Sequence, residues 1–275
     1  MKDDTLPKLL LHKAEQLGDR TALREKEFGI WQTVTWRQFA DHVCHFALGL
    51  RALGVQRGDK IAIIGDNRPE WLYAELAIQS LGGAAVGVYQ DSVAEEVRYI
   101  IQASDVRVII AEDQEQVDKV LEIWDDLRDV LKVIYYYPKG LRNYDYPFLA
   151  DFPSIEALGQ EYVQQYPTMF EAEIAAGSGD DIALLATTSG TTAQPKLAML
   201  THTNLISQGH GLLAVDPIDT RDEFVSFLPL AWIGEQMVTV AAGLQAGFTI
   251  NFPESANTVQ ENIQEIGPHV MFSPP

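Results

Sequence analysis

Short runs of β-branched and apolar residues alternate along this chain with segments whose apolar residues recur at helical spacing. This alternation is typical of βα units, in which parallel strands form a sheet and the intervening helices cover its faces. It constrains the fold more than any other feature, and it predicts an α/β protein built on mostly parallel sheets flanked by helices. The runs expected as strands are 60–64, 84–89, 106–111, 130–137, 182–186, 197–201, 224–228 and 248–251.

Capping signals mark the helices between these runs. An apolar stripe over 6–17 stops at Gly18, and Thr35 with Gln38 forms a capping-box signal before a helix that ends near residue 54. Ser92 with Glu95 predicts a cap for another helix. Further helices are expected over 69–81, 114–124, 155–165, from 204, and over 258–266.

The composition limits the classes of partner and compartment. Of the 275 residues, 39 are acidic and 20 basic, a formal net charge of −19, which argues against nucleic acid as a partner because phosphates are repelled. The single cysteine, Cys44, forms no internal disulfide and suits a reducing compartment. Residues 1–4 are polar and no export signal follows them, so a cytoplasmic location is expected.

We expect two units in the chain. Residues 1–180 form a first α/β subdomain with a surface excursion at 138–153, which is rich in Pro, Gly, Asn and Asp. Residues 181–275 carry a phosphate loop and the start of a second α/β subdomain. The uncharged stretch 236–253 has the length of a membrane span, but polar residues and glycines interrupt it, so a buried helix followed by a strand is expected. The apolar end on two prolines predicts a fragment of a longer protein.

One segment has the composition of a phosphate-binding loop. Residues 187–196 read TTSGTTAQPK directly after an expected buried strand. Small residues let backbone N–H groups approach an anion, hydroxyl groups donate to phosphate oxygens, and Lys196 supplies a positive charge. The segment is not a Walker loop, because Lys196 follows Pro195 and leads into a strand. From the residues alone, a solvated hydroxyl-rich loop is an equal alternative.

The segment 187–202, TTSGTTAQPKLAMLTH, resembles the signature loop of the adenylate-forming enzymes. Within that superfamily the chain is most similar to bacterial long-chain fatty acyl-CoA synthetases, whose first half it would cover. Other segments agree with this family in order and spacing, at 35–54, 58–71, 81–89, 228–236 and 251–275.

This resemblance implies a two-step reaction that consumes ATP with Mg²⁺. A carboxylate attacks the α-phosphate of ATP to form an acyl-adenylate and pyrophosphate, and the thiol of coenzyme A then displaces AMP. The partners implied are therefore small molecules: a fatty acid, ATP and coenzyme A. The resemblance leaves open whether the protein contacts a membrane surface to take up the acid and whether it forms a homodimer.

The resemblance also implies roles for individual residues. Lys196 and Thr188 are the catalytic candidates, and Thr188 is the candidate magnesium ligand. Trp232 and Gly234 are expected beside the acid, although a core tryptophan is an equal alternative for Trp232. The residues expected to hold the β and γ phosphates are Thr188, Ser189, Gly190, Thr191, Thr192 and Lys196.

The chain departs from the family pattern at several points. Ala193 and Leu197 replace glycines of the signature loop, and the Tyr-Gly-x-Thr-Glu and Thr-Gly-Asp motifs and the C-terminal lysine domain are absent. We therefore expect this chain to be inactive or very weak alone. A non-catalytic nucleotide-binding relative and a ligase for a shorter or aryl acid are the alternatives. His202 and His210 lack a nucleophile partner and are expected to anchor loops or lie at the surface.

Overall fold

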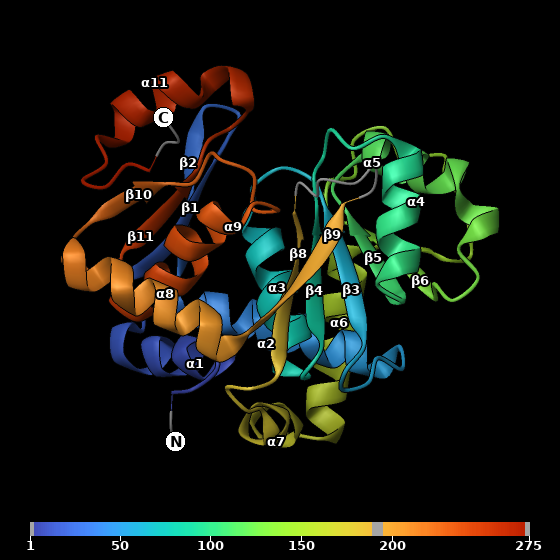
Figure 1. Cartoon of the computed structure of the whole chain (residues 1–275), viewed down its shortest axis with the longest axis horizontal. Coiled ribbons are helices and arrows are strands. Elements are labelled where there is room, and N and C mark those ends of the chain that lie inside the picture. Colours follow the sequence, from blue (N-terminus) through green and yellow to red (C-terminus); the bar gives the residue numbers. More distant parts are fainter. Residues whose placement is uncertain (1–2, 189–194, 273–275) are drawn as a thin grey trace.

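The structure, a computed structural model, describes residues 3–188 and 195–272 (Figure 1). Its strands form two sheets. The bounds of the strands are β1 (Thr21–Glu27), β2 (Ile30–Thr35), β3 (Lys60–Ile64), β4 (Ala84–Val88), β5 (Val106–Ala111), β6 (Lys132–Tyr135), β7 (Leu149–Asp151), β8 (Ile182–Thr188), β9 (Lys196–Thr201), β10 (Glu223–Val225) and β11 (Thr249–Phe252).

Helices pack against these sheets. Short 3-10 turns η1 (Trp124–Asp126) and η3 (Ala256–Thr258) and a π-helix, η2 (Gln236–Ala242), accompany the α-helices. The bounds of the α-helices are α1 (Leu6–Leu17), α2 (Trp36–Ala52), α3 (Pro69–Ser80), α4 (Ala94–Ala103), α5 (Gln114–Glu122), α6 (Phe152–Gln165), α7 (Met169–Ala176), α8 (His202–Val215), α9 (Ile233–Glu235), α10 (Gly243–Ala246) and α11 (Val259–Ile266).

Both sheets are mixed but mostly parallel. Within the described residues, the larger sheet has the order β7-β6-β5-β3-β4-β8-β9 and the smaller sheet the order β10-β11-β1-β2. Only β8 with β9 and β1 with β2 are antiparallel. The α/β architecture predicted from the alternating pattern is therefore confirmed.

One core continues from the larger sheet into the smaller one. Successive residues of β3 point to opposite faces, so Ile61 packs with α2, α3 and α6, while Ala62 packs with α4 and α5. The core that contains Ile61 also contains Leu23 of β1 and Ile250 of β11. Burial of this shared apolar surface holds the two sheets together.

The division at residue 180 does not coincide with the division of strands between the sheets. β1 and β2 lie before that position but belong to the smaller sheet, whereas β8 and β9 lie after it but belong to the larger one. Hydrogen bonding across long sequence separation sets this arrangement, since β1 pairs in parallel with β11 and places Leu23 opposite Ile250.

The structure contains a hairpin of β1 and β2 that was not predicted from the sequence. β1 reads TALREKE, and its run of charges hides the alternation typical of a strand. The structure neutralises these charges with distant partners: Arg24 pairs with Glu223 at 2.7 Å and Lys26 with Glu265 at 2.6 Å. Neither partner can be identified from the local sequence.

The surface excursion expected at 138–153 is too long at its C-terminal end. Its last residues form β7, which adds to the edge of the larger sheet, and α6 begins at Phe152. Pro153 lies in the first helical turn, where its missing N–H costs nothing, and the Asp151 side chain caps that turn. This proline therefore belongs to a helix start and not to a loop.

Two predicted helix starts are also wrong. Ser92 does not cap α4, whose N-cap is Val93 without a side-chain hydrogen bond. The helix expected from Asn204 begins two residues earlier, at His202, because Thr201 is its N-cap and forms a capping box with Asn204. By contrast, the uncharged stretch 236–253 contains a buried helix followed by β11, as predicted. In the described part of the chain, no helix is both long and apolar enough to cross a bilayer.

Helices α2 and α6 approach each other unusually closely. A Cβ atom at Gly159 would lie 1.7 Å from the carbonyl oxygen of His45, and one at Gly49 would lie 2.1 Å from that of Ile155. Both distances are shorter than atoms allow, so these glycines are required for the contact.

We expect Gly159→Ala to lower the free energy of unfolding by about 1–3 kcal/mol, because the helices must separate. A methyl group on Gly211 of α8 would have no heavy atom within 4 Å, so Gly211→Ala should raise that free energy by up to ~1 kcal/mol through helix propensity. The midpoint of urea unfolding measures both. Equal effects of the two substitutions would contradict the close contact.

Candidate functional site

The predicted phosphate loop connects the two antiparallel strands β8 and β9. Thr188 ends β8 and lies directly opposite Lys196, which begins β9. Directly opposed residues of a pair place their side chains on the same face. The hydroxyl group of Thr188 donates to the carbonyl oxygen of Lys196 at 3.3 Å, and both residues are exposed. The structure thus brings these two predicted site residues together at the mouth of the loop.

The C-terminal end of the loop is anchored to α4. The hydroxyl group of Tyr99 donates to the carbonyl oxygen of Pro195 at 3.2 Å. Leu197, which replaces a family glycine, pairs with Thr187 and packs against the core beneath α4 and α5. A strand residue with an apolar contact explains why leucine is tolerated there. Four predicted phosphate-binding residues, Ser189, Gly190, Thr191 and Thr192, and the substitution Ala193 lie outside the described residues.

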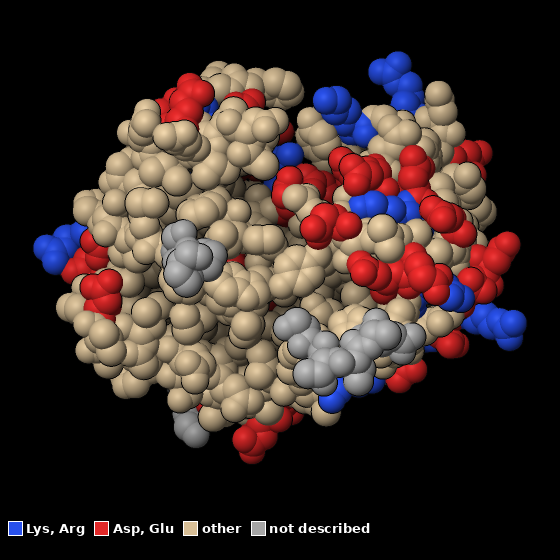
Figure 2. All heavy atoms as spheres, turned by 45° about the horizontal axis from the view of Figure 1, so that its top comes forward, with Lys and Arg blue, Asp and Glu red and all other residues tan. Residues whose placement is uncertain are grey.

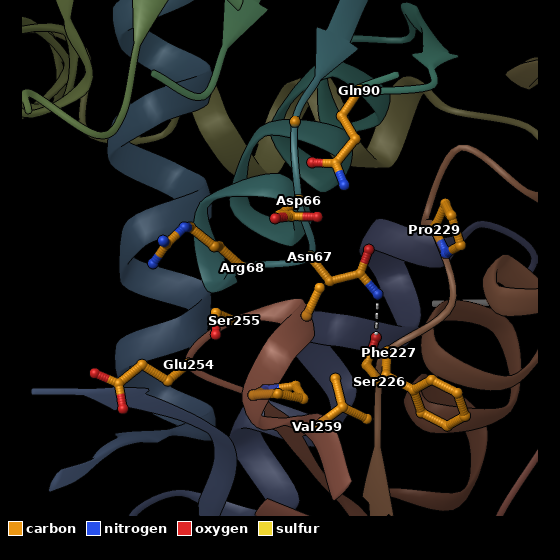
Figure 3. A pocket seen from close by; sticks show the side chains of 13 residues that line it. Asp66, Asn67, Arg68, Gln90, Ser226, Phe227, Pro229, Glu254, Ser255 and Val259 are labelled. Carbon is orange, nitrogen blue, oxygen red and sulfur yellow. Dashed lines mark hydrogen bonds between the residues drawn. The ribbon is translucent and has the colours of Figure 1, made fainter. Parts of the chain in front are cut away.

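A cleft of about 110 Å³ opens between the two sheets (Figure 3). It lies beyond the carboxyl ends of β3 and β4, where β4 and β5 depart to opposite sides of β3. Such a reversal of strand order is where open α/β sheets usually bind ligands. The larger sheet contributes Asp66, Asn67, Arg68 and Gln90, and the smaller sheet contributes Ser226, Phe227, Pro229, Glu254 and Val259.

Arg68 joins both sheets at this cleft. Its guanidinium donates to Glu112, after β5, at 2.8 Å and to Glu25 of β1 at 2.5 Å. Burial alone would lower the pKa of Arg68, but the two carboxylates raise it above its ordinary value. Burial raises the pKa of Glu25 and Glu112, and Arg68 opposes that rise. The network keeps a buried cation paired between the sheets.

Asn67 connects β3 to the loop that follows β10. Its amide nitrogen donates to the hydroxyl oxygen of Ser226 at 2.9 Å (Figure 3) and to the carbonyl oxygen of Leu228 at 2.7 Å. Its amide oxygen accepts from the N–H of Leu230 at 2.9 Å. All the polar atoms of this side chain are used. Asn67 therefore fixes the position of the loop that carries Trp232.

Trp232 lies outside this cleft, beyond the loop that Asn67 holds. Its ring stacks on Phe272, with centroids 5.8 Å apart and planes 17° from parallel. A Cβ atom at Gly234 would lie 2.4 Å from the same ring, so Gly234 provides the space that the indole occupies. The two residues predicted to lie beside the acid are in contact, and neither lines the cleft at Asn67.

Two buried carboxyl groups support the Trp232 loop. Glu235 accepts from Ser226 at 2.6 Å and Thr239 at 2.7 Å through one oxygen, and its other oxygen is buried without a partner among the described residues. Glu75 accepts from Gln236 at 2.7 Å. Burial raises the pKa of Glu235 and of Glu75 to about 7, against the hydrogen bonds that they accept. Both groups hence change protonation near neutral pH.

The histidines considered from the sequence have structural roles or none. Nδ1 of His202 accepts from the N–H of Leu6 at 3.2 Å, and burial lowers the pKa of His202 to about 4. His202 is therefore neutral and anchors the start of α1, in line with the anchoring role expected. His210 is exposed on α8.

Sequence reasoning missed Asn67, Arg68 and Glu235 as contributors to this region. A signal was present for the first two, because GDNR, at 65–68, places polar side chains directly after a buried strand. No local signal pointed to Glu235, whose partner Ser226 is nine residues away and whose loop is joined to Asn67 across 163 residues.

Comparison with known proteins gives consistent matches. A family model described as AMP-binding enzyme matches residues 10–275. The chain is 28% identical over 278 residues to the long-chain-fatty-acid–CoA ligase ACSBG2 of Rattus norvegicus, covering 98% of this chain and 41% of that protein. It is 31% identical over 252 residues to the long-chain-fatty-acid–CoA ligase FadD15 of Mycobacterium tuberculosis, covering 90% of this chain and 40% of that protein. The chain thus spans about 40% of the length of these relatives.

Solved structures share the fold. The anthranilate CoA ligase AuaEII in complex with anthranoyl-AMP superposes with a TM-score of 0.81 at 20% identity, covering 98% of this chain and 49% of that one. The long-chain-fatty-acid-CoA ligase FadD1 of Archaeoglobus fulgidus gives 0.79 at 17% identity, covering 96% and 50%. At these identities the likeness is one of fold.

The raised pKa of Glu235 predicts a pH dependence of stability. Its folded-state pKa of about 7 lies above the ordinary 4.5, so the folded state holds the proton more tightly than the unfolded state. The free energy of unfolding therefore falls as the pH rises from 4.5 to 7, by at most ~1.4 kcal/mol per pH unit for one group. Glu235→Gln keeps the oxygen that accepts from Ser226 and removes this titration, so it should gain stability relative to wild type as the pH rises.

Urea unfolding of both proteins at several pH values between about 5 and 8 measures this difference. The exposed Glu261 of α11 provides the matched control, since Glu261→Gln should follow the wild-type curve. Parallel curves for Glu235→Gln and wild type would show that Glu235 does not titrate in this range.

Proposed function

Because the chain belongs to the AMP-binding enzyme family, we propose that it is the ATP-binding part of an AMP-forming acid–thiol ligase that activates a fatty acid. The observation that carries this proposal is the loop between β8 and β9, whose flanking residues Thr188 and Lys196 lie opposite each other. At the mouth of this loop, the Thr188 hydroxyl group can donate a hydrogen bond to a phosphate oxygen of ATP and the Lys196 ammonium group can neutralise phosphate charge. The relatives named as long-chain-fatty-acid–CoA ligases support the choice of acid.

In this proposal the chain positions ATP and neutralises its charge. A carboxylate oxygen of the acid forms a bond to the α-phosphorus while the bond to pyrophosphate breaks, and the thiol of coenzyme A then takes the acyl group and releases AMP. Lys196 balances charge on the departing phosphates, and Thr188 with the loop hydroxyls donates hydrogen bonds. The Trp232 loop, held by Asn67, lies on the acid side.

Magnesium would reach this site mainly through the nucleotide. The described residues contain no group of three or more acidic, histidine or cysteine side chains that could hold a metal ion. Mg²⁺ typically keeps several waters and binds phosphates with only one or two protein ligands. The hydroxyl of Thr188 fits the role of such a single ligand, and the ion supplies charge neutralisation of the phosphates.

We expect Lys196→Ala to weaken ATP binding by the 275-residue chain at least about tenfold, since a charge-assisted contact with phosphate is lost. Equilibrium dialysis with labelled ATP measures the affinity. Lys60→Ala, which removes a cation from the opposite end of the larger sheet, is the matched control and should leave it unchanged. Equal affinity of the Lys196→Ala variant and wild type would refute the loop as the phosphate site.

ATP–pyrophosphate exchange with acids from acetate to stearate tests the chemistry itself. Exchange that depends on Lys196 would establish adenylation and identify the acid, and a preference for short or aryl acids would replace the fatty-acid assignment. We expect the 275-residue chain to be silent, and a longer chain that includes it to be active. ATP binding without exchange by the longer chain would favour a non-catalytic nucleotide-binding protein.

A further inference from the structure

A second groove, of about 670 Å³, lies between the tip of the β1–β2 hairpin and the segment that follows β6. It has the size of a small-molecule site. Its lining combines aromatic rings with two cations: Phe28, Tyr135, Tyr137, Tyr144, Lys139 and Arg142.

The groove is distinct from the phosphate loop. In the larger sheet β6 is four strands away from β8. At about 4.8 Å per strand, the carboxyl ends of these two strands are roughly 19 Å apart. A ligand in the groove therefore makes contacts of its own, whatever the loop binds.

The backbone conformation and the exposure of Phe28 are unfavourable for the stability of the folded state. It occupies the first position of a two-residue turn with φ +47°, followed by Gly29 with φ +76°, and its side chain is 87% exposed. Such a turn favours Asn, Asp or Gly, because a residue with a Cβ atom is strained at positive φ. An exposed aromatic ring in a strained backbone suggests a functional constraint rather than a contribution to stability.

The opposite wall of the groove is rigid. The hydroxyl group of Tyr144 donates to Asp118 at 2.7 Å and accepts from Gln114 at 2.8 Å. The guanidinium of Arg68 lies 4.8 Å from the centroid of the Tyr137 ring and fixes it. The aromatic surface is thus held ready to stack on a ligand without a loss of side-chain freedom.

Two cations in this wall are unpaired although the chain is strongly acidic. Within the described residues, Lys139 and Arg142 form no ion pair or hydrogen bond, and both side chains are exposed. Figure 2 shows acidic side chains gathered over the half of the molecule that contains α4 and α5. With a net charge of −19, neighbouring acids could have neutralised these cations. Free cations beside aromatic rings complement a ligand that is both planar and anionic.

We propose that this groove binds an adenine nucleotide, with its base stacked on Phe28 and Tyr137 and its phosphates at Lys139 and Arg142. A smaller adjoining pocket contains Glu27 and Glu254, which would repel phosphates. Its two cations, Lys26 and Arg68, are already paired with other carboxylates. This asymmetry sets the orientation of the ligand. The nucleotide is either free or the nucleotide part of coenzyme A, and the second assignment rests on the proposed function.

Binding of adenosine 3′,5′-bisphosphate to the 275-residue chain tests the proposal by calorimetric titration. The titration uses the Lys196→Ala background, so that the loop does not contribute. We expect Phe28→Asn and Arg142→Ala each to weaken binding at least about tenfold. Phe28→Asn should also raise the urea midpoint, because asparagine suits the turn, so its loss of binding is not a loss of folding.

Matched controls share the surroundings of these residues but do not line the groove. Ile30 lies on the same hairpin and is 62% exposed, and Arg128 is an exposed cation before β6, at the opposite end of that strand. Ile30→Thr and Arg128→Ala should bind as tightly as the background protein. Absence of saturable binding, or equal binding by Phe28→Asn, would overturn the proposal, as would equally tight binding of inorganic phosphate.

Competition identifies the source of the nucleotide. Displacement of the bisphosphate by coenzyme A at lower concentration than by ATP assigns the groove to the coenzyme, and the reverse order assigns it to a free nucleotide. ATP binding that depends on Lys196 but not on Phe28 tests the loop separately. Failure of the groove and failure of the proposed function therefore give different results.

Discussion

The side chains of Asn67 and Arg68 join the two sheets at the cleft and add polar contacts to the apolar core that the sheets share. Arg68 is a buried cation, and it is tolerated because Glu25 of the smaller sheet and Glu112 of the larger one both accept from it. Asn67 uses its whole amide group on the loop after β10. These adjacent residues set the width of the cleft and the position of Trp232. The candidate site is therefore a property of the junction rather than of either sheet.

The sequence predicted those parts of the fold in which local pattern and tertiary environment agree. β3 and β5 are buried on both faces apart from Lys60 and Arg107, and their mostly apolar runs were predicted with the correct bounds. β1 was missed because Arg24 and Lys26 are paired with residues some two hundred positions away. Glu235 and the hydrogen bonds of Asn67 were missed for the same reason, because their partners are distant in sequence or lie in another loop. Hydroxyl residues and a lysine predicted a phosphate loop because the chemistry of such a loop is contiguous in sequence, and its role stays a proposal.

Some basic residues of this molecule pair with carboxylates inside the protein, whereas others are exposed to solvent. Cations near the junction of the sheets form ion pairs within the protein: Arg68 pairs with Glu25 and Glu112, and Lys26 pairs with Glu265. Lys196 and the two cations beyond β6 are exposed instead. In a chain with this excess of acid, exposed cations without a partner among the described residues are candidates for contact with an anion only where neighbouring groups suit a ligand. Lys196 belongs to the proposed phosphate loop, and the aromatic neighbours of Lys139 and Arg142 give the second place a chemistry of its own.

The parallel pairing of β1 with β11 has a consequence for biosynthesis. Arg24 reaches Asn251 across a separation of 227 residues, so the first hairpin leaves the ribosome long before its neighbour in the sheet exists. At about 5–20 residues per second, that wait lasts roughly ten seconds to most of a minute. Every described strand of the larger sheet has emerged once β9 has, so these strands can order first, whereas β1 keeps one edge unpaired until β11 emerges. Nascent chains of this protein accordingly keep one unpaired strand edge at the N-terminal hairpin until β11 emerges, and the charged residues of β1 limit aggregation through that edge.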